Sequence, residues 1–373
     1  MTSVDWTRLE PHRPLDLMSV GRYVARPEGG AGRLAQLVQA GAKAIAVVGP
    51  TGIGKSTELM MAASLLIARG QHFASPFLLD HLRAQAPALD ALQAYREFFS
   101  AMMAMNLAQQ AGDQQIQLSA GLLEKLKRLS ESPDLESSGD TGDLLLEVLR
   151  EVRRASGQKP VTLLCDGLEK YDGEEAGEVL EELLRLRDEA ALVIVVPTAL
   201  VVGPQSYEVI SNFKLFPVHP VPIRDEDGTS ASVGRGFLKA IVYRRLNLAP
   251  SAVPELDPVL ERAAEASGGV PRAFLQLVLD ASMYARLAER EWPTLEDLGE
   301  AMGDHAESLR RLLIKGDVDA LRAADGTDGL EVDPERRLRF LTHGLLLEYK
   351  IDDRIVVHPA PLLAGVLARS GRA

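Results

Sequence analysis

Short apolar runs separated by helical stretches organise the first two thirds of the chain. Four of these runs cover residues 44–48, 72–80, 161–166 and 192–196. Each is short enough for a buried strand, and the segments between them carry apolar residues at steps of three or four, the period of a helix. A fifth run, residues 215–221, contains two prolines and is therefore expected at a sheet edge. Alternating strands and helices predict an α/β protein with a parallel five-stranded sheet.

The middle of the chain is predicted to be almost entirely helical. Residues 84–133 already show helical spacing between the second and third strands. Polar residues 224–230 read as a linker, and amphipathic helices are expected over 236–246 and 259–266. The second of these helices ends at Gly268-Gly269, a C-terminal cap signal, and Pro271 suits the first turn of another helix. The sheet is therefore expected to be followed by an all-α region.

The last segment changes character again. An apolar helical run over 338–347 leads into alternating residues 348–359 with a polar turn at Asp352-Asp353, and a further helix is expected after it. Helix, hairpin and helix resemble a winged helix. From residue 330 onward the chain has seven basic and six acidic residues, a net charge of about +1. Such a weak positive charge favours docking to protein over gripping the phosphates of DNA, although DNA stays an alternative.

Bulk composition is that of an ordinary globular protein. The 373 residues are 46% hydrophobic and 25% charged, with a formal net charge of −12, which argues against nonspecific binding to nucleic acid or anionic membranes. The single cysteine, Cys165, is expected to be a small buried residue, and a reducing cytoplasm is the expected compartment. The longest apolar run, residues 190–203, contains Pro197 and is too short to span a membrane.

The strongest chemical signal lies between the first strand and the first helix. The pattern G-x-x-x-x-G-K-[ST] matches there, in the strand, turn and helix context that gives it meaning. Its glycines let backbone N–H groups curl around a polyphosphate, and the helix N-terminus adds a positive dipole end. Lys55 is predicted to reach the β- and γ-phosphates, and Ser56 to bind Mg²⁺. The predicted nucleotide-binding residues are Gly49, Pro50, Thr51, Gly52, Ile53, Gly54, Lys55, Ser56 and Thr57.

Acidic and polar residues follow two of the later strands. Asp166 ends the third strand, where ligands bind in open α/β sheets, and is predicted to hold Mg²⁺ through its bound waters. Glu169 is the preferred candidate to activate the attacking water, with Asp172 as the second choice; either acid could instead cap a helix. Thr198, after the fourth strand, is a candidate contact to the γ-phosphate or the water, or else a cap.

Two further features concern the nucleotide. Arg272 falls in the first turn of a helix, where the dipole disfavours a cation; a bound phosphate would compensate, as would a surface ion pair. The lead-in segment Gly21–Pro27 carries Tyr23 and Val24 and either wraps over the adenine or forms a surface arm.

These motifs together resemble the AAA+ ATPases, in particular the origin-recognition-like and STAND-like branches. Residues 49–56 look like Walker A, and residues 163–169 look like Walker B with a displaced acid. Thr198 and residues 268–272 fall where sensor 1 and sensor 2 would lie. The resemblance implies a lead-in (1–30), a P-loop core (31–224), a helical lid (230–305) and a winged-helix-like tail (306–373).

The sequence departs from that family at two places. AAA+ hydrolases usually place the catalytic acid directly after the Walker B aspartate, where this chain has Gly167. Lys214 stands where an arginine finger would be expected. The resemblance therefore implies a molecular switch that binds ATP or ADP with Mg²⁺, hydrolyses slowly and controls a protein partner, and oligomerisation is allowed. A DNA-associated initiator or transposition-type ATPase and a non-hydrolysing nucleotide scaffold are the alternatives.

Overall fold

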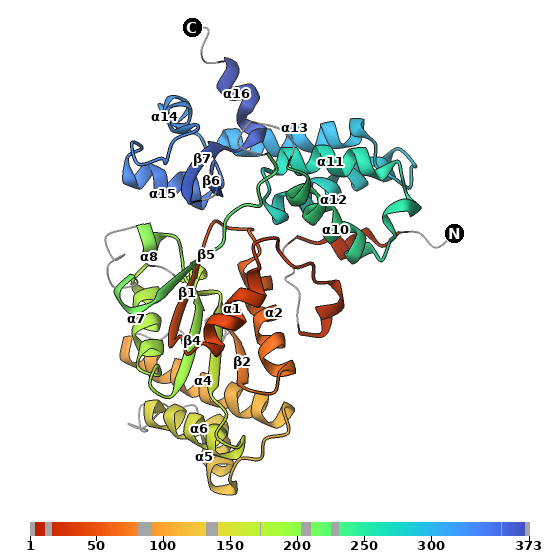
Figure 1. Cartoon of the computed structure of the whole chain (residues 1–373). Helices are drawn as coiled ribbons and strands as arrows, with labels where there is room; N and C mark the ends of the chain where they lie inside the picture. The colour runs from red at the N-terminus through yellow and green to blue at the C-terminus, as the bar shows by residue number, and fades with distance from the viewer. Residues whose placement is uncertain are drawn as a thin grey trace. The chain divides into compact units, whose positions relative to one another are not determined.

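The computed structural model describes residues 4–11, 17–80, 92–131, 141–171, 173–202, 210–224, 231–351 and 353–369. The chain divides into two compact units (Figure 1). The lid unit comprises Met1–Gly30, Gly49–Thr57 and Pro217–Ala373, and the sheet unit comprises Ala31–Val48 and Glu58–Phe216. The phosphate-loop motif, residues 49–57, thus groups with the C-terminal half of the chain.

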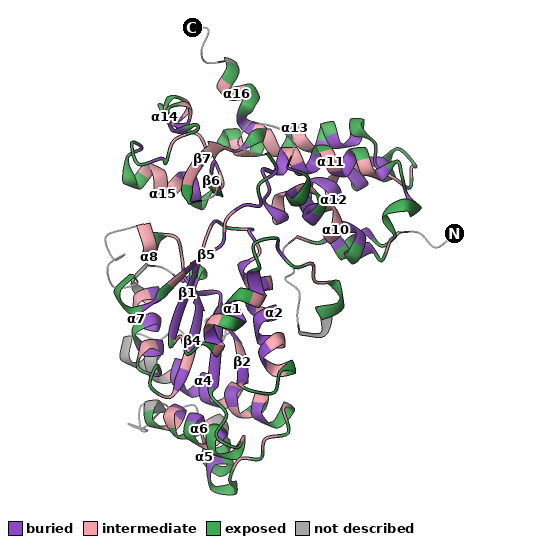
Figure 2. Ribbon diagram, in the orientation of Figure 1, coloured by how far each residue is buried: buried purple, intermediate pink, exposed green. Residues whose placement is uncertain are grey.

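The sheet unit contains one five-stranded parallel sheet in the order β2-β3-β4-β1-β5. Its strands are β1 (Ala44–Val48), β2 (Phe73–Leu78), β3 (Val161–Asp166), β4 (Ala190–Val195) and β5 (Lys214–Pro217). All six residues of β3 are buried, as expected for a central strand covered on both faces (Figure 2). The predicted fifth strand lies at an edge, as its prolines require, but it ends at Pro217 and not at residue 221.

Helices supply the remaining core of the sheet unit. Phe73, Phe77 and Leu163 from the strands pack with Phe99 and Met103. The methionine cluster at residues 102–105 is therefore core, since Met102 and Met105 pack against the same cluster. The helices of this region are α1 (Gly30–Gln39), α2 (Lys55–Ala68), α4 (Leu92–Asp113), α5 (Ala120–Glu131), α6 (Thr141–Ala155), α7 (Gly173–Leu184) and α8 (Ala199–Val202).

The lid unit is helical around a second core. Its helices are α10 (Ser232–Leu246), α11 (Leu256–Ser267), α12 (Pro271–Leu287), α13 (Leu295–Arg311), α14 (Asp317–Ala324), α15 (Pro334–Thr342) and α16 (Ala364–Arg369), with short 3-10 helices at Trp6–Leu9, Leu17–Arg22, Pro250–Ala252 and Pro361–Leu363. The predicted division at residue 305 falls inside α13, and the four-segment organisation stays a prediction.

Local sequence signals set the helix ends of this unit. Gly268 caps α11 in the left-handed conformation, and Pro271 occupies the first turn of α12, both as the sequence predicts. Thr294 and Asp297 form a reciprocal capping box at the start of α13. Arg290 pairs with Asp297 at 2.7 Å, and these contacts lower the pKa of that carboxyl against the opposing effect of burial.

The N-terminal segment is part of the helical core. Trp6 and Leu9 are buried among α10, α11 and α12, and the ring of Trp6 meets that of Trp292 edge to face at 5.6 Å. Residues 6–9 therefore anchor the N-terminal segment in the helical core. Apolar side chains this large are stabilised by roughly 1.5–3 kcal/mol each when buried, which is enough to hold a short segment in place.

The C-terminal segment forms the expected hairpin. Strands β6 (Leu346–Ile351) and β7 (Arg354–Pro359) pair antiparallel, with Ile351 opposite Arg354. They pack with α14 and α15 around Phe340 and Leu345. This helix, hairpin and helix arrangement is compatible with a winged helix. Within the described residues, no helix is long and apolar enough to cross a membrane.

Candidate functional site

The phosphate loop adopts a conformation that needs its glycines. Gly49, Gly52 and Gly54 have φ angles of 150°, 82° and 100°, values that L side chains rarely adopt. A Cβ at Gly49 would collide with the carbonyl oxygen of Val218, and one at Gly52 would lie 2.8 Å from Cβ of Arg272. At Gly54 a Cβ would meet no atom within 4 Å, so this part of the loop faces open space that a ligand can enter.

Lys55 directs its ammonium group into the loop. Its Nζ donates to the carbonyl oxygens of Gly49 at 2.9 Å and Pro50 at 3.0 Å, and the residue is only 9% exposed. A buried lysine held by main-chain oxygens is a fixed positive charge at the centre of the loop. Ser56 and Thr57 follow in the first turn of α2, where the helix dipole also favours an anion.

Arg272 is joined to this loop through its main chain. Its backbone N–H donates to the carbonyl oxygen of Gly52 at 3.1 Å. The N–H groups of the first helical turn have no partner within the helix, so α12 offers this donor without loss of an internal bond. The sequence linked Arg272 to the loop through a compensating phosphate and a family resemblance; the structure shows that its backbone contacts the loop directly.

Arg26 is a site residue that sequence reasoning missed. Its side chain is buried and donates to the carbonyl oxygens of Ile53 at 3.0 Å and His219 at 2.5 Å. It also lies over the ring of Phe237, with 5.7 Å between Cζ and the centroid, and pairs with Glu28. The lead-in segment thus binds the loop backbone through Arg26. In the sequence, this role was indicated only by the Arg-Pro step at residues 26–27.

Asp166 lies at the carboxyl edge of the sheet. It is 6% exposed and ends β3, two strands from β1 in the sheet order. Cys165 pairs with Ile194 on β4, and the next residue of β4, Val195, pairs with Val47 on β1. Asp166, the residue after Cys165, therefore lies level with the end of β1. Neighbouring strands are about 4.8 Å apart, so Asp166 lies roughly 10 Å from the end of the strand that leads into the loop.

The turn after Asp166 leaves little room for a side chain at position 167. Gly167 has a φ of 93°, and a Cβ there would be 3.0 Å from both the backbone nitrogen and a carboxylate oxygen of Asp80. A side chain at this position would be strained whatever its chemistry. An acid cannot be placed directly after Asp166 without moving Asp80, and Glu169 is the next acidic residue along the chain.

Glu169 is exposed on a single 3-10 turn, Leu168–Lys170, whose first residue is buried. Lys170 beside it pairs with Asp80 at 2.5 Å, and that hydrogen bond raises the pKa of the lysine. Tyr171 donates its hydroxyl to the carbonyl oxygen of Leu79 at 2.6 Å. These contacts fasten the turn to the end of β2, a constraint that sequence reasoning did not foresee. Asp172, the second candidate base, lies outside the described residues.

The other predicted residues lie near strand ends. Thr198 follows β4, is half-buried, and its carbonyl oxygen accepts the N–H groups of Val201 and Val202 at 3.0 Å. Cys165 is fully buried, and burial raises the pKa of its thiol, so it is an inert core residue as predicted. Lys214, at the place of the expected arginine finger, begins β5 and is exposed, while residues 203–209 before it lie outside the described residues.

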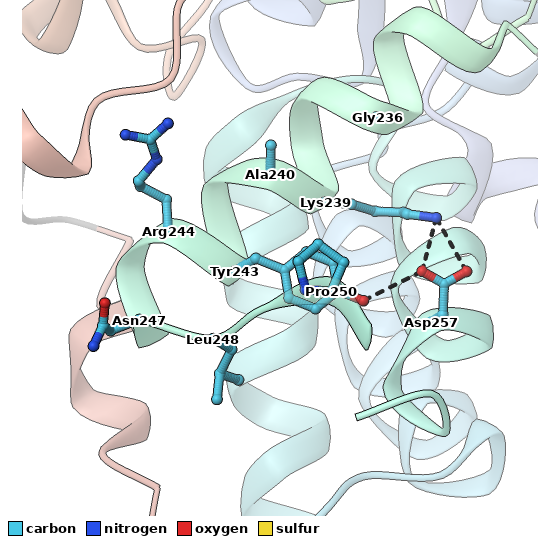
Figure 3. A pocket seen from close by; sticks show the side chains of 9 residues that line it. All are labelled: Gly236, Lys239, Ala240, Tyr243, Arg244, Asn247, Leu248, Pro250 and Asp257. Atoms are coloured by element: carbon cyan, nitrogen blue, oxygen red, sulfur yellow. Dashed lines mark hydrogen bonds and ion pairs between the residues drawn. The ribbon is translucent and has the colours of Figure 1, made fainter. Parts of the chain in front are cut away.

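A separate cavity lies on the lid unit (Figure 3). It has a volume of about 460 Å³ and is lined by α10 and residues up to Asp257. Lys239 pairs with Asp257 at 2.8 Å and with Glu261 at 2.7 Å, and Tyr243 donates to Asp257 at 3.2 Å. The charges on this side of the cavity thus satisfy one another, and none of the residues predicted from the sequence lines it.

The residues of the loop fit a nucleotide polyphosphate. Lys55 and the N–H groups in the first turn of α2 supply the hydrogen-bond donors that phosphates require. The open space beside Gly54 supplies the room. Among the described residues no group of three or more His, Cys, Asp or Glu side chains could hold a metal ion. A P-loop does not need such a cage, since Mg²⁺ there is held by one hydroxyl, a carboxylate, waters and phosphate oxygens.

Comparison with known proteins agrees with this geometry. Residues 32–196 match the family described as AAA ATPase domain. The chain is similar to the ORC2 protein of Aeropyrum pernix, solved as ADPNP and ADP complexes, with 12% identity, a TM-score of 0.50 and 99% of each chain covered. No curated protein sequence matches the chain.

Two further solved structures are also similar. The ORC1 protein of A. pernix in complex with DNA has 14% identity and a TM-score of 0.47, with 98% of this chain and 97% of that chain covered. Cdc6p of Pyrobaculum aerophilum has 14% identity and a TM-score of 0.48, with 98% of each chain covered. The fold and the loop define a P-loop NTPase. More narrowly, residues 32–196 resemble an AAA ATPase domain, and the fold of the chain is similar to that of the A. pernix ORC2 protein.

Proposed function

We propose that the chain is an ATP-binding switch that hydrolyses ATP slowly. The observation that carries this proposal is the loop itself: Lys55 lies among the carbonyls of Gly49 and Pro50, and Gly54 faces open space. Residues 49–57 would bind the phosphates of ATP or ADP through backbone N–H groups, with Lys55 as the fixed cation.

Magnesium would be held by the Ser56 hydroxyl and, through bound waters, by Asp166. Bound there, it supplies positive charge that offsets the charge of the phosphates. Asp166 is buried at the sheet edge and ends a strand whose six residues are all buried, which supports a rigid position for the carboxylate. Thr198 at the end of β4 is proposed to orient the γ-phosphate or the water.

Glu169 is proposed to orient and activate the attacking water. Its position on a short turn, two residues beyond the usual one, supports slow turnover, since a base displaced from the usual geometry gives up part of the gain from orientation. The guanidinium of Arg272 is proposed to bind phosphate from the lid side. Loss of the γ-phosphate would then remove the contact between the phosphate and the guanidinium of Arg272. The helices of residues 230–305 could then move, and this movement would change the surface that the C-terminal segment presents to a protein partner.

Nucleotide binding and hydrolysis test this proposal separately. Titration calorimetry with ATP and Mg²⁺ is expected to show binding by the parent and weakening by Lys55→Ala of at least tenfold, about 1.4 kcal/mol. Single-turnover hydrolysis is expected to fall by about 10²-fold or more in Glu169→Gln, the usual contribution of a general base. Equal single-turnover rates in parent and Glu169→Gln would leave only the non-hydrolysing scaffold.

A DNA-associated initiator is the second candidate, favoured by the hairpin with its exposed Lys350 and Arg354. The basic residues of α15 argue against it. Arg339 and Arg336 contact Asp317 at 2.5 and 3.6 Å, and Arg337 contacts Glu348 at 3.3 Å.

Arginines engaged in this way are poorly placed to bind DNA phosphates. We therefore expect no mobility shift of duplex DNA even at low salt, and a salt-dependent shift would instead support the initiator.

A further inference from the structure

Three backbone positions of the phosphate loop are held by other segments of the lid unit. Arg272 N–H binds the Gly52 carbonyl, and the guanidinium of Arg26 binds the Ile53 carbonyl. Gly49 lies so close to the carbonyl oxygen of Val218 that no side chain would fit between them. Any movement of the loop backbone therefore acts on residue 26, on residue 272, and on the segment that follows β5.

The same segments hold the C-terminal hairpin. His219, whose carbonyl accepts from Arg26, lies with its Nδ1 3.3 Å from the Glu348 carbonyl oxygen and 3.8 Å from a Glu348 carboxylate oxygen. The carboxylate of Glu348 reaches Arg337 on α15 at 3.3 Å. One continuous series of polar contacts thus runs from Ile53 in the loop to the helix that packs on the hairpin.

A second series of contacts reaches the hairpin through the glycines before α12. Tyr349 donates its buried hydroxyl to the Gly268 carbonyl at 2.6 Å, and Val221 N–H donates to the Gly269 carbonyl at 3.0 Å. A Cβ on Gly268 would collide with Leu347, and one on Gly269 with the Val221 carbonyl. Contacts this close leave the hairpin, the glycine pair and α12 little room to move separately.

Occupation of the loop must disturb this arrangement. Lys55 Nζ is engaged by the Gly49 and Pro50 carbonyls, and phosphate oxygens would compete for the same ammonium protons. The carbonyls released by this competition lie within four residues of Gly52 and Ile53. The loop then has two arrangements, one with Lys55 bound to the main-chain carbonyls and one with Lys55 bound to phosphate. A ligand that binds these two arrangements with different affinity shifts the population between them.

We propose that His219 and Tyr349 couple nucleotide occupancy of the phosphate loop to the C-terminal hairpin. The proposal rests on the proposed function, because it takes the occupant to be a nucleotide. Arg26 and Arg272 are the connections on the loop side, and Glu348 and Gly268 are those on the hairpin side. The hairpin is thus the element through which the state of the loop is presented to a partner.

Hydrogen exchange on the full-length chain tests the coupling. Amide exchange of residues 346–359 is measured without nucleotide, with ADP and Mg²⁺, and with ATPγS and Mg²⁺. The parent is expected to show a change of about 5-fold to 150-fold in hairpin exchange on saturation, the usual range for coupled sites. Tyr349→Phe and His219→Gln are each expected to lose most of this change at nucleotide concentrations that saturate them.

The matched control is Tyr284→Phe, which removes an exposed hydroxyl bound to Asp304 on the neighbouring helix. This variant is expected to retain the full change. Unchanged hairpin exchange in the saturated parent, or a full change in both coupling variants, would overturn the inference. Calorimetry separates the two failures: absence of nucleotide binding contradicts the proposed function, whereas binding without a hairpin response contradicts only the coupling.

Discussion

The backbone N–H of Arg272 donates a hydrogen bond to the carbonyl oxygen of Gly52 at 3.1 Å. A helix that follows a Gly-Gly-Val-Pro sequence is thereby fastened to the phosphate loop more than 200 residues earlier in the chain. Since the bond is a main-chain bond, it survives any substitution of the arginine that preserves the helix. The contribution of the guanidinium can therefore be measured while the bond between α12 and the loop stays in place.

Arg272→Ala is expected to weaken ATP binding by roughly 10-fold to 150-fold, because a charge-assisted bond to phosphate contributes about 1.5–3 kcal/mol. Calorimetry with ATP and ADP measures the loss. The control is Arg262→Ala on α11, whose side chain is exposed and pairs with Glu265 at 2.9 Å; this change should leave affinity as it was. Equal affinities in parent and Arg272→Ala would refute the phosphate role of the guanidinium.

Gly52→Ala is expected to lower stability and nucleotide affinity together. Its φ of 82° strains any side chain by about 1–3 kcal/mol, and the new Cβ would press on Cβ of Arg272. Gly41→Ala is the matched control, because Gly41 has a φ of 90° but no atom within 4 Å of the position that a Cβ would take. Urea unfolding should show the backbone strain in both variants and a further loss of stability in Gly52→Ala, and only Gly52→Ala should lose ATP binding.

Gly167→Glu moves the acid to the position that AAA+ hydrolases usually use. We expect this variant to lose about 1–3 kcal/mol of unfolding free energy and to gain no turnover, because Gly167 is left-handed and touches Asp80. Gly157→Glu, at a φ of 76° with open space around it, controls for the backbone strain. A faster steady-state ATPase rate in Gly167→Glu would show that the turn tolerates the usual geometry.

The free energy of unfolding is expected to fall at acidic pH because the imidazole of His219 is buried. Burial lowers the pKa of its imidazole from 6.5, opposed by the carboxylates of Glu348 and Glu28 and assisted by Lys350. Below pH 6.5 the unfolded chain binds a proton that the folded chain does not, so unfolding becomes easier by up to about 1.4 kcal/mol per pH unit. Above pH 6.5 this contribution to the pH dependence vanishes.

Urea unfolding of the parent and of His219→Gln between pH 5 and pH 8 measures this effect. The glutamine variant should lose less stability on acidification than the parent does. His343→Gln, which removes an exposed imidazole, is the control. Parallel pH profiles in parent and His219→Gln would show that folding does not lower the pKa of this imidazole.

The residues of the loop and the order of the elements could be predicted from the sequence because their causes are local. Alternating buried strands, the prolines of β5, the glycine C-cap of α11 and the proline at the start of α12 each act within a few residues. The P-loop pattern belongs to the same category, since its chemistry lies in nine consecutive residues. The position of Asp166 at the end of a buried strand was predicted in the same way, whereas its role stays a prediction.

Only the tertiary structure showed how distant residues contact the loop and the turn after β3. Arg26 and Asp80 carry no local signal, because an arginine before a proline and an aspartate after a strand are both common on surfaces. Their roles come from approaches across long sequence separations: Arg26 to His219, and Asp80 to Gly167 and Lys170. The chain alone determined that it has a phosphate loop. Packing decided which side chains hold that loop and why position 167 has little room for a side chain, since backbone strain and close contact exist only after folding.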